Sequence, residues 1–349
     1  MTLSNGVKIG SDEDDFTARV RRVALYAQDE WAVNPNWSVH AGLRTESIRT
    51  GGENPDGTRP SNRSQVTTPL VHFLYKPDPK QRDQIRISLT RSYKSPTLNN
   101  LIARPSYSSR FSDLTKTNDP TSPDRTGNPD LRPELASGID VAFERYLPEG
   151  GVLSANVFAR RLSDYIRNVT SLQTVGYSPA QRWVSRPENV GRAFTAGIEL
   201  EAKFRLDQAI TGAPPVEVRS NVSVFKSRVD EVPGPDNRLD SQPRGTANLG
   251  LDYRFRGTPL TIGGNLNLTP GYRTRMSELQ ATTMPVKHQF DMFALWVFNP
   301  AAQMRLNLTN LNASDYTTSN IYDLDTVRQR QVTTNQTYLN WRLSLELKL

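Results

Sequence analysis

Apolar and polar residues alternate with a period of two along most of this chain. Between Thr195 and Leu206 every even position is apolar, whereas the odd positions carry threonine, glycine or a charged residue. Such a pattern gives one apolar and one polar face in an extended strand, because a helix would mix the two sets. The same alternation closes the sequence, where Trp341, Leu343 and Leu345 are separated by polar residues. No segment shows a convincing 3.6-residue period, so the chain is predicted to be all-β.

The alternation predicts thirteen strands. They fall at residues 18–32, 36–49, 66–76, 83–93, 135–147, 151–166, 182–206, 215–228, 243–256, 259–272, 286–298, 302–311 and 336–348. Strands of globular proteins average about five or six residues, but many of these hold about ten or more. Such lengths suit strands that cross an apolar band about 25 Å tall at a tilt.

The connections between the predicted strands are alternately short and long. The short ones fall at 33–35, 77–82, 148–150, 207–214, 257–258 and 299–301, and the long polar ones at 50–65, 94–134, 167–181, 229–242, 273–285 and 312–335. This alternation is typical of transmembrane antiparallel β-barrels of the bacterial outer membrane, with short periplasmic turns and long extracellular loops. A large soluble β-sandwich remains the alternative fold, whereas a propeller would repeat with a period of about 40 residues.

The strand count bears on how much of a barrel the chain forms. A single-chain bacterial barrel has an even number of strands and begins and ends on the periplasmic side. Counting back from the last strand, the strand at 18–32 runs inward. Leu3, Val7 and Ile9 fit a fourteenth, rising strand, with the acidic residues 11–15 as its outer loop. No signal sequence follows Met1, so we expect the chain to be part of a longer protein.

Composition narrows the classes of function. Hydrophobic residues make up 36% of the 349 residues, and cysteine is absent. No run of eighteen apolar residues occurs, which excludes membrane-spanning helices, and the lack of cysteine excludes disulfides and thiolate zinc sites. The net charge is +7, but the basic residues are dispersed rather than clustered, which argues against nucleic acid as a partner.

Five short motifs then point to a family. The octapeptide GNPDLRPE at 127–134 stands directly before a predicted strand. The others are LYAQDEW at 25–31 with GLRTE at 42–46, YKSPTL at 93–98, NVGRA at 189–193 leading into GIELE at 197–201, and NLNASDY at 310–316. Together and in this order they resemble the strand and turn motifs of TonB-dependent outer-membrane receptors. The resemblance covers about the last thirteen or fourteen strands of the 22-stranded barrel that such transporters have.

The resemblance implies an outer-membrane receptor of a Gram-negative bacterium that imports a scarce nutrient, such as a ferric siderophore. In this family the TonB–ExbB–ExbD complex supplies energy through a TonB box and a plug domain. Neither is visible here, so residues 1–349 are assigned to the barrel domain. A passive porin-like channel remains the alternative function, and no enzymatic activity is expected. Leu349 stands where outer-membrane assembly signals usually place an aromatic residue.

The long connection at 94–134 carries the candidate ligand-binding residues. Arg104, Tyr107, Arg110 and Phe111 put guanidinium and aromatic groups in a segment expected outside the membrane. Arginine binds carboxylate, catecholate or phosphate groups, and aromatic rings stack on planar ligands. The alternative is that these residues pack the loop or contact lipopolysaccharide phosphates. Outer-membrane lipid and lipopolysaccharide are expected partners of the barrel itself.

Residues of the family motifs are expected to have structural roles. Prolines fix φ where the chain turns back into a strand, and a glutamate there can accept local backbone hydrogen bonds. The charged residues Glu199, Glu201, Lys203 and Arg205, in and after the GIELE segment, are expected to face the barrel lumen, where charge is tolerated. The motif residues that are expected to have structural roles are Asn128, Pro129, Leu131, Pro133, Glu134, Asn189, Gly191, Gly197 and Glu199.

No pattern indicates catalysis, a metal or a cofactor. His40, His72 and His288 are far apart in sequence and are expected to be ordinary strand residues rather than ligands. The acidic residues 11–15 lack the spacing of a calcium loop. A phosphate-binding loop, a nucleophile elbow and a zinc-protease helix are all missing from the sequence.

Overall fold

The structure is a computed structural model that describes residues 2–4, 7–9, 17–53, 59–147, 150–324 and 327–348. Strands dominate this part of the chain, which confirms the predicted all-β class. Its helices are short: α1 (Leu98–Leu101), the 3-10 helix η2 (Ser109–Phe111) and α2 (Leu206–Ala209). None of the described helices has the length and apolar character needed to cross a membrane.

Thirteen of the described strands form one antiparallel sheet, in the spatial order β22-β19-β18-β15-β14-β13-β12-β9-β8-β6-β5-β4-β3. Each of the thirteen predicted segments contains or overlaps one of them. Their bounds are β3 (Thr17–Asn34), β4 (Trp37–Glu53), β5 (Ser61–Tyr75), β6 (Gln84–Lys94), β8 (Glu134–Tyr146), β9 (Val152–Ser163), β12 (Ala193–Arg205), β13 (Val216–Val229), β14 (Gly245–Arg254), β15 (Leu260–Thr269), β18 (Lys287–Asn299), β19 (Ala302–Thr309) and β22 (Asn340–Leu347).

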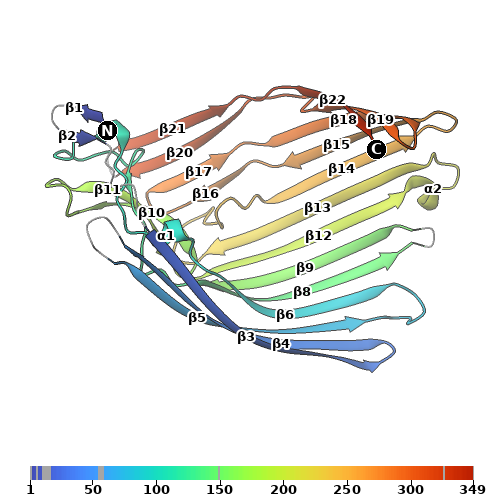
Figure 1. Cartoon of the computed structure of the whole chain (residues 1–349), viewed down its shortest axis with the longest axis horizontal. Helices are drawn as coiled ribbons and strands as arrows, with labels where there is room; N and C mark the ends of the chain where they lie inside the picture. The colour runs from blue at the N-terminus through green and yellow to red at the C-terminus, as the bar shows by residue number, and fades with distance from the viewer. Residues whose placement is uncertain are drawn as a thin grey trace.

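Figure 1 shows that the sheet has two unlike ends. The short connections lie at one end, the turn end, where β22 also finishes. The long connections gather at the opposite end, the loop end, together with the smaller sheets. The predicted alternation of short and long connections is therefore a separation in space.

Along each strand of the large sheet, side chains alternate between an apolar face and a polar face. On β12, Ile198 and Leu200 are each 50% exposed on the apolar face, and Glu199 between them lies on the polar face. The register keeps neighbouring strands in step, because Ile198 pairs with Val157 of β9 and with Val224 of β13. A slip of one residue would turn every apolar side chain to the wrong face.

Two smaller sheets stand at the loop end, where the sequence predicts loops. β16 (Tyr272–Arg275), β17 (Gln280–Met284), β20 (Tyr316–Leu324) and β21 (Val327–Asn335) form a four-stranded sheet. β10 (Ile166–Gln173), β11 (Arg182–Asn189) and β7 (Asp124–Arg125) form a three-stranded one. The connections at 167–181, 273–285 and 312–335 therefore contain strands, since neighbouring connections pair with one another.

The single strand predicted at 182–206 is wrong, because the structure divides it into β11 and β12. The break falls at Gly191, whose φ of 95° lies in the left-handed region that glycine adopts without strain. The chain changes direction there and leaves the small sheet for the large one. The continuous alternation of side chains conceals this break.

The fourteenth strand suggested at the start of the chain is also wrong. β1 (Thr2–Ser4) and β2 (Val7–Ile9) pair with each other in a separate two-stranded sheet. Leu3, Val7 and Ile9 thus belong to a local pairing, which needs only a short connection between its strands. Residues 11–15 and Leu349 lie outside the described residues.

Buried side chains concentrate at the loop end. A small core joins Tyr165, Ala193, Val229 and Val232, where the ends of β9, β12 and β13 meet the β13–β14 connection. Leu131, in the turn before β8, is 1% exposed. The loop end is therefore packed like a small domain interior, whereas the large sheet keeps two accessible faces.

Candidate functional site

The polar face of the large sheet carries a groove of about 810 Å³ that extends from β3 to β12. Its lining includes four carboxylate groups and one guanidinium group. They belong to Glu30, Asp140, Glu144, Glu201 and Arg86. Within the groove Arg86 forms an ion pair with Glu144. Arg160, beside the lining, also pairs with Asp140 at 2.6 Å. Glu30 and Glu201 are therefore the lining carboxylates without an ion pair to a described residue, and they favour a cationic or basic partner.

Two histidines lie side by side in this groove. His40 of β4 pairs directly with His72 of β5, and the two rings stack with centroids 5.6 Å apart. His72 Nδ1 lies 2.8 Å from Ser88 Oγ. The sequence distance between these histidines hides the contact, and His288 instead lies against Asn312 near the loop end of β18. Among the described residues no group of three histidine or carboxylate side chains is arranged to hold a metal ion.

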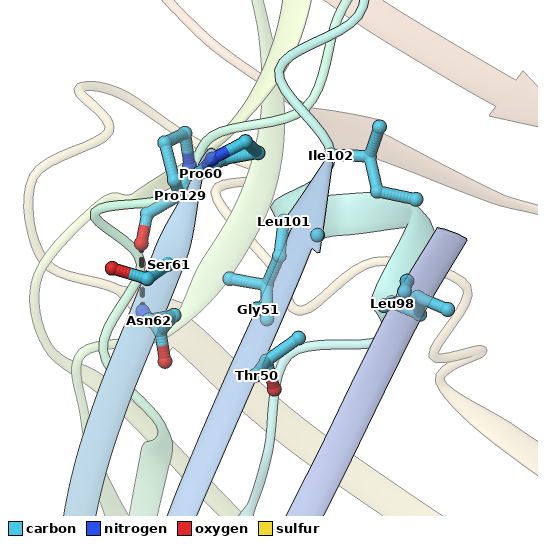
Figure 2. A pocket seen from close by; sticks show the side chains of 11 residues that line it. Thr50, Gly51, Pro60, Ser61, Asn62, Leu98, Leu101, Ile102 and Pro129 are labelled. Carbon is cyan, nitrogen blue, oxygen red and sulfur yellow. Dashed lines mark hydrogen bonds between the residues drawn. The ribbon is translucent and has the colours of Figure 1, made fainter. Parts of the chain in front are cut away.

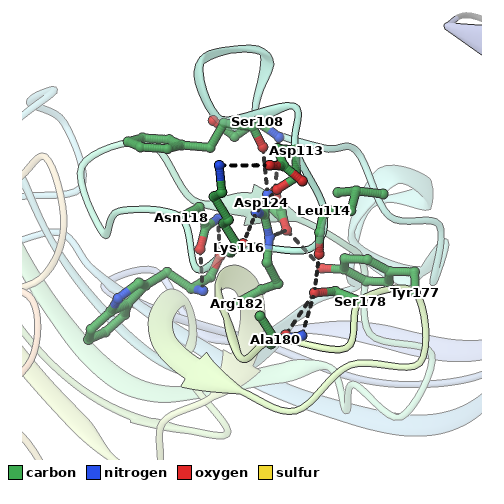
Figure 3. Close-up of polar contacts among 12 residues, drawn as sticks. Ser108, Asp113, Leu114, Lys116, Asn118, Asp124, Tyr177, Ser178, Ala180 and Arg182 are labelled. Carbon is green, nitrogen blue, oxygen red and sulfur yellow. Dashed lines mark hydrogen bonds and ion pairs between the residues drawn. The ribbon is translucent and has the colours of Figure 1, made fainter. Parts of the chain in front are cut away.

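Arg182 organises the connection between β6 and β8, residues 95–133. Its side chain is fully buried, and so is that of Asp124, with which it forms an ion pair of 2.8 Å from Nε to Oδ2. Its two Nη atoms donate to the carbonyl oxygens of Phe111 at 3.0 Å and Lys116 at 2.7 Å. Figure 3 shows how these contacts gather the loop around one guanidinium. A single residue of β11 thus fixes a loop whose contacting residues precede it by 58 to 71 positions.

The ionisation of this cluster follows from its contacts. Burial raises the pKa of Asp124, but the hydrogen bonds from Arg182, Ser108 and Tyr177 outweigh it and hold that pKa below its usual value. Burial and the Asp124 charge raise the pKa of Tyr177, whose hydroxyl donates to Asp124 Oδ2 at 3.1 Å. At neutral pH the cluster is therefore a carboxylate, a guanidinium and a neutral phenol.

Three of the four candidate ligand-binding residues, Tyr107, Arg110 and Phe111, lie around this cluster. Tyr107 is 48% exposed and its ring lies 5.0 Å from that of Tyr177. The Arg110 guanidinium lies 5.6 Å from the ring of Phe111, whose carbonyl binds Arg182. Arg104 is half-buried, and its backbone N–H donates to Ile102. The structure therefore joins Arg110 with Phe111 and places Tyr107 against a partner that the sequence does not reveal.

The same loop reaches a hairpin far along the chain. The Gln329 side chain of β21 donates to Asp119 Oδ2 at 2.6 Å, and Thr121 donates to the other carboxylate oxygen. Burial raises the pKa of Asp119, but these hydrogen bonds outweigh it and lower that pKa overall. The contact links the β6–β8 connection to the β20–β21 hairpin, which connects β19 to β22; six strands of the large sheet lie between β8 and β19.

The family motif at 127–134 forms a turn that hydrogen bonds hold in place. Asn128 donates to the carbonyl of Pro187, and the Asn189 side chain both accepts from the backbone of Arg132 and donates to it, at 2.9 and 3.0 Å. Pro133 and Leu131 are buried. The buried Glu134 accepts from the backbone N–H of Ile166 at 2.8 Å. The turn therefore joins the starts of β8 and β10 to the end of β11.

A small pocket lies beside this turn, between the loop ends of β3, β4 and β5 and helix α1 (Figure 2). Its volume is about 20 Å³, enough for about one water molecule. Asn62 donates to the carbonyls of Pro129 and Leu131 at 2.7 and 2.8 Å. Leu98 and Leu101 present apolar side chains toward the strands. The pocket is a packing feature that seats the turn on the sheet.

The remaining motif residues lie where β12 meets its neighbours. A Cβ at Gly191 would overlap the Glu231 carboxylate, which accepts from the backbone N–H of Arg192 at 2.9 Å. A Cβ at Gly197 would lie 2.8 Å from aromatic rings on both neighbouring strands. Glu199 accepts from the Asn156 amide at 3.0 Å on the polar face. These contacts explain why small residues occupy the two glycine positions.

A second buried arginine, Arg167 of β10, was not suggested by the sequence. It is 1% exposed, and it pairs with Asp240 at 2.5 Å. It also donates to the carbonyls of Arg238 and Met276 at 2.7 and 2.9 Å. The connection after β13 thereby folds over the polar face, where Gln242 donates to Thr195 at 3.0 Å. No spacing in the sequence signals either buried arginine, because their partners are backbone carbonyls and distant aspartates.

Comparison with known proteins assigns the family. The sequence profile described as "TonB dependent receptor-like, beta-barrel" matches residues 2–311. No curated protein matches the chain. Similar solved structures include the siderophore receptor PiuA from Acinetobacter baumannii, with a TM-score of 0.63 and 16% identity over 95% of this chain and 44% of that one.

Two further structures have the same fold. The ferric citrate transporter FecA in its unliganded form gives a TM-score of 0.66 at 15% identity, and the copper transporter OprC gives 0.66 at 12%. Each alignment covers 95% of this chain but 45% of FecA and 48% of OprC, so the chain spans less than half the length of these relatives. The expected barrel fold and the resemblance drawn from the five motifs are confirmed: the chain belongs to the TonB dependent receptor-like β-barrel family.

Proposed function

We propose that this chain is the barrel wall, with its outer loops, of a Gram-negative outer-membrane receptor that imports a ferric siderophore or another scarce nutrient. The apolar face supports a place in lipid. Leu25 is 76% exposed there and Trp341 72%, and such side chains continue across the sheet. Soluble proteins rarely expose so large an apolar surface, whereas lipid covers it on an outer-membrane barrel.

The observation that carries the proposal is the organised loop end. Arg182 and Asp124 hold residues 95–133 in one arrangement, so that Tyr107, Arg110 and Phe111 are presented from a fixed framework. Binding groups held in place before the ligand arrives lose less conformational entropy on binding. We therefore propose Arg104, Tyr107, Arg110 and Phe111 as contacts for an anionic, partly planar ligand. A siderophore receptor and a ferric citrate transporter among the structural neighbours support an iron chelate.

Energy coupling is proposed on family grounds. In TonB-dependent receptors the TonB–ExbB–ExbD complex acts through a plug domain inside the barrel. The groove on the polar face would then meet the plug, and its two carboxylates without an ion pair to a described residue, Glu30 and Glu201, favour basic plug side chains opposite them. In this arrangement the barrel wall and its loops bind the nutrient and enclose its path across the membrane.

Uptake measurements test the proposal. Cells that lack the gene should lose accumulation of radiolabelled iron supplied with one member of a panel of chelators, and the gene should restore it. Deletion of TonB should abolish the same uptake. Accumulation that continues without TonB and does not saturate would instead indicate the passive channel.

Loop variants connect uptake to the candidate residues. Tyr107→Ala and Arg110→Ala should raise the half-saturating ligand concentration, because each removes one proposed ligand contact. Lys80→Ala, an exposed cation at the turn end, is the matched control and should leave uptake unchanged. If the loop variants and the control took up the ligand equally well, the proposal that residues 104–111 contact the ligand would be wrong.

A further inference from the structure

Four neighbouring strands present an amide side chain at the same level of the polar face. The register pairs Asn221 of β13 with Asn248 of β14, whose amide donates to Asn221 Oδ1 at 2.6 Å. Asn248 pairs in turn with Asn267 of β15, and Asn267 with Gln289 of β18. Residues directly opposite one another in antiparallel strands share a face and have Cβ atoms about 4.5–5.5 Å apart. These four residues therefore form one continuous polar strip across the sheet, the amide row.

The amide row lies at the level of the apolar wall. The residues next to it in sequence turn their side chains to the apolar face, and large exposed ones among them are Val222, Leu249 and Leu266. A nutrient that crosses the membrane inside a barrel must pass the level at which the outer face meets lipid. The amide row is therefore placed where the wall encloses a passage, rather than among the loops that receive the ligand.

A hollow of about 270 Å³ opens along the amide row, between β12 and β15. Gly250 lies in its lining without a side chain to fill it, and a Cβ there would already lie 2.6 Å from the Asn265 amide oxygen. Glu201 and Lys203 of β12 border the hollow with opposite charges. Liquid water occupies about 30 Å³ per molecule, so the hollow has room for about nine water molecules or for a polar group of a ligand.

The chemistry of the amide row differs from that of the groove between β3 and β12. In the groove, Arg86 of β6 forms an ion pair with Glu144 of β8. From β13 to β18, Arg219 with Asp252 is the one ion pair that joins two described strands. Amide groups donate and accept hydrogen bonds and carry no net charge. A passage needs contacts that attract a solute and still release it, and the uncharged amide row meets that requirement better than fixed charges do.

We propose that the amide row lines the route by which the nutrient passes along the wall, and that it binds the oxygen atoms of a hydrophilic chelate in passing. Carboxylate, catecholate and hydroxyl oxygens all accept hydrogen bonds from amide N–H groups. The inference rests on the proposed function and deepens it, because it assigns the passage to one side of the wall. The nutrient would leave the loops along β13 to β18, while the groove between β3 and β12 faces the plug.

Tryptophan substitutions in the full receptor test the route by uptake of the radiolabelled iron chelate. Asn248→Trp and Asn267→Trp should each lower the maximal uptake rate about tenfold, because lost hydrogen bonds in the passage are worth about that factor. The half-saturating concentration should not change, since the ligand first binds among the loops. Ala247→Trp and Leu266→Trp add the same ring one residue away on the apolar face and should keep the native rate. Asn248→Asp and Asn267→Asp keep the side-chain size, should slow an anionic chelate likewise, and replace any tryptophan variant that fails to assemble.

Photo-cross-linking locates the nutrient in transit. A benzophenone amino acid at Asn248 should capture radiolabelled chelator in cells that are taking it up. The same amino acid at Ala142, which lines the groove between β3 and β12, should capture little or none. The comparison needs no change in the uptake rate, because it reports directly which side of the wall the chelate touches.

The two measurements separate this inference from the proposed function. Saturable uptake by native cells that depends on TonB supports the proposed function whatever the variants do. Native uptake rates in the variants at Asn248 and Asn267, or capture at Ala142 equal to that at Asn248, would overturn the inference alone. If native uptake is passive instead, the proposed function fails, and capture at Asn248 still decides whether the amide row lines the route.

Discussion

Replacement of Asp124 by asparagine should open the loop at 95–133 without disturbing the large sheet. The side chains of Asp124 and Arg182 are both fully buried. Four hydrogen bonds reach the carboxylate, from the Ser108 N–H at 2.9 Å, Arg182 Nε at 2.8 Å, Arg182 Nη2 at 2.9 Å and the Tyr177 hydroxyl at 3.1 Å. Asparagine keeps the size of the side chain but removes its charge. Arg182 then remains as a buried cation without its counter-ion.

The magnitude follows from that uncompensated charge. Removal of one partner from a buried ion pair costs about 3–5 kcal/mol. The carbonyls of Phe111 and Lys116 still accept from Arg182, so we expect the lower end, about 3 kcal/mol, which is about a hundredfold in the opening equilibrium. The cost is local because the pair lies beyond the end of the thirteen-stranded sheet.

Hydrogen exchange followed by mass spectrometry measures the effect. Peptides from residues 104–125 should exchange about a hundredfold faster in the variant, because their opening costs about 3 kcal/mol less. Peptides from β8 and β9 should be unchanged. Asp130→Asn is the matched control, since Asp130 is exposed in the same loop.

A double variant separates charge from shape. Arg182→Met added to Asp124→Asn removes the orphan cation, so the double variant should regain part of the protection that the single variant loses. Unchanged exchange in Asp124→Asn, or a double variant that opens as much as Asp124→Asn or more, would refute the argument.

The same cluster predicts sensitivity to acid. The pKa of Asp124 is lower in the folded loop than in the open one, so its contribution is complete above the ordinary carboxyl pKa of about 3.9 and is lost as the pH falls through the folded value. Cleavage of the loop by an acid protease should accelerate below about pH 4 in the native protein. In Asp124→Asn cleavage should already be fast, and its further gain from acid should be smaller than in the native protein, because Asp119 is then the partly buried carboxylate left to protonate in this loop.

Three other changes probe the faces and ends of the sheet. Leu200→Arg on the apolar face should destabilise the barrel by about 2–4 kcal/mol if the site lies near mid-membrane. Glu201→Arg on the polar face should have a smaller effect. Equal loss of heat-modifiable gel migration in the two variants would contradict the assignment of faces. Gly197→Val should cost about 1–3 kcal/mol, because it forces branched atoms between two aromatic rings, and a urea midpoint equal to that of the native protein would show that the rings move aside freely. A cysteine at Thr117 should react with an impermeant thiol reagent on whole cells and one at Lys80 only after the outer membrane is opened; the reverse order would invert the orientation.

The strands of the large sheet could be predicted because each carries its own signal. A side chain on β12 or β22 either faces the apolar side or it does not, and the period of two records this residue by residue. The ends of the strands follow from composition, since turns at one end are short and rich in proline, asparagine and glycine. Pairing between successive strands then needs no further information.

The interior of the loop end could not be predicted in this way. Arg182 and Arg167 look like surface cations in the sequence, and they are buried because carbonyl groups from several separate segments converge on them. The sequence also gives no sign of the break between β11 and β12 at Gly191, because the alternation of apolar and polar residues continues through it. The motif residues were identified through a family resemblance, whereas Tyr177 and Asp124 carry no pattern at all. Long-range polar contacts depend on three-dimensional placement that local periodicity does not encode.

The hydrogen bond between Asp119 and Gln329 has a consequence for the order of assembly. Its two residues are 210 positions apart, and contacts between such distant segments form slowly because the intervening chain must first be ordered. The loop at 95–133 is synthesised long before the β20–β21 hairpin exists, so the contact between its tip and that hairpin is missing through most of biogenesis. Docking of this tip onto the hairpin is therefore a late folding event, and formation of the Asp119–Gln329 hydrogen bond reports that the C-terminal strands have reached their places.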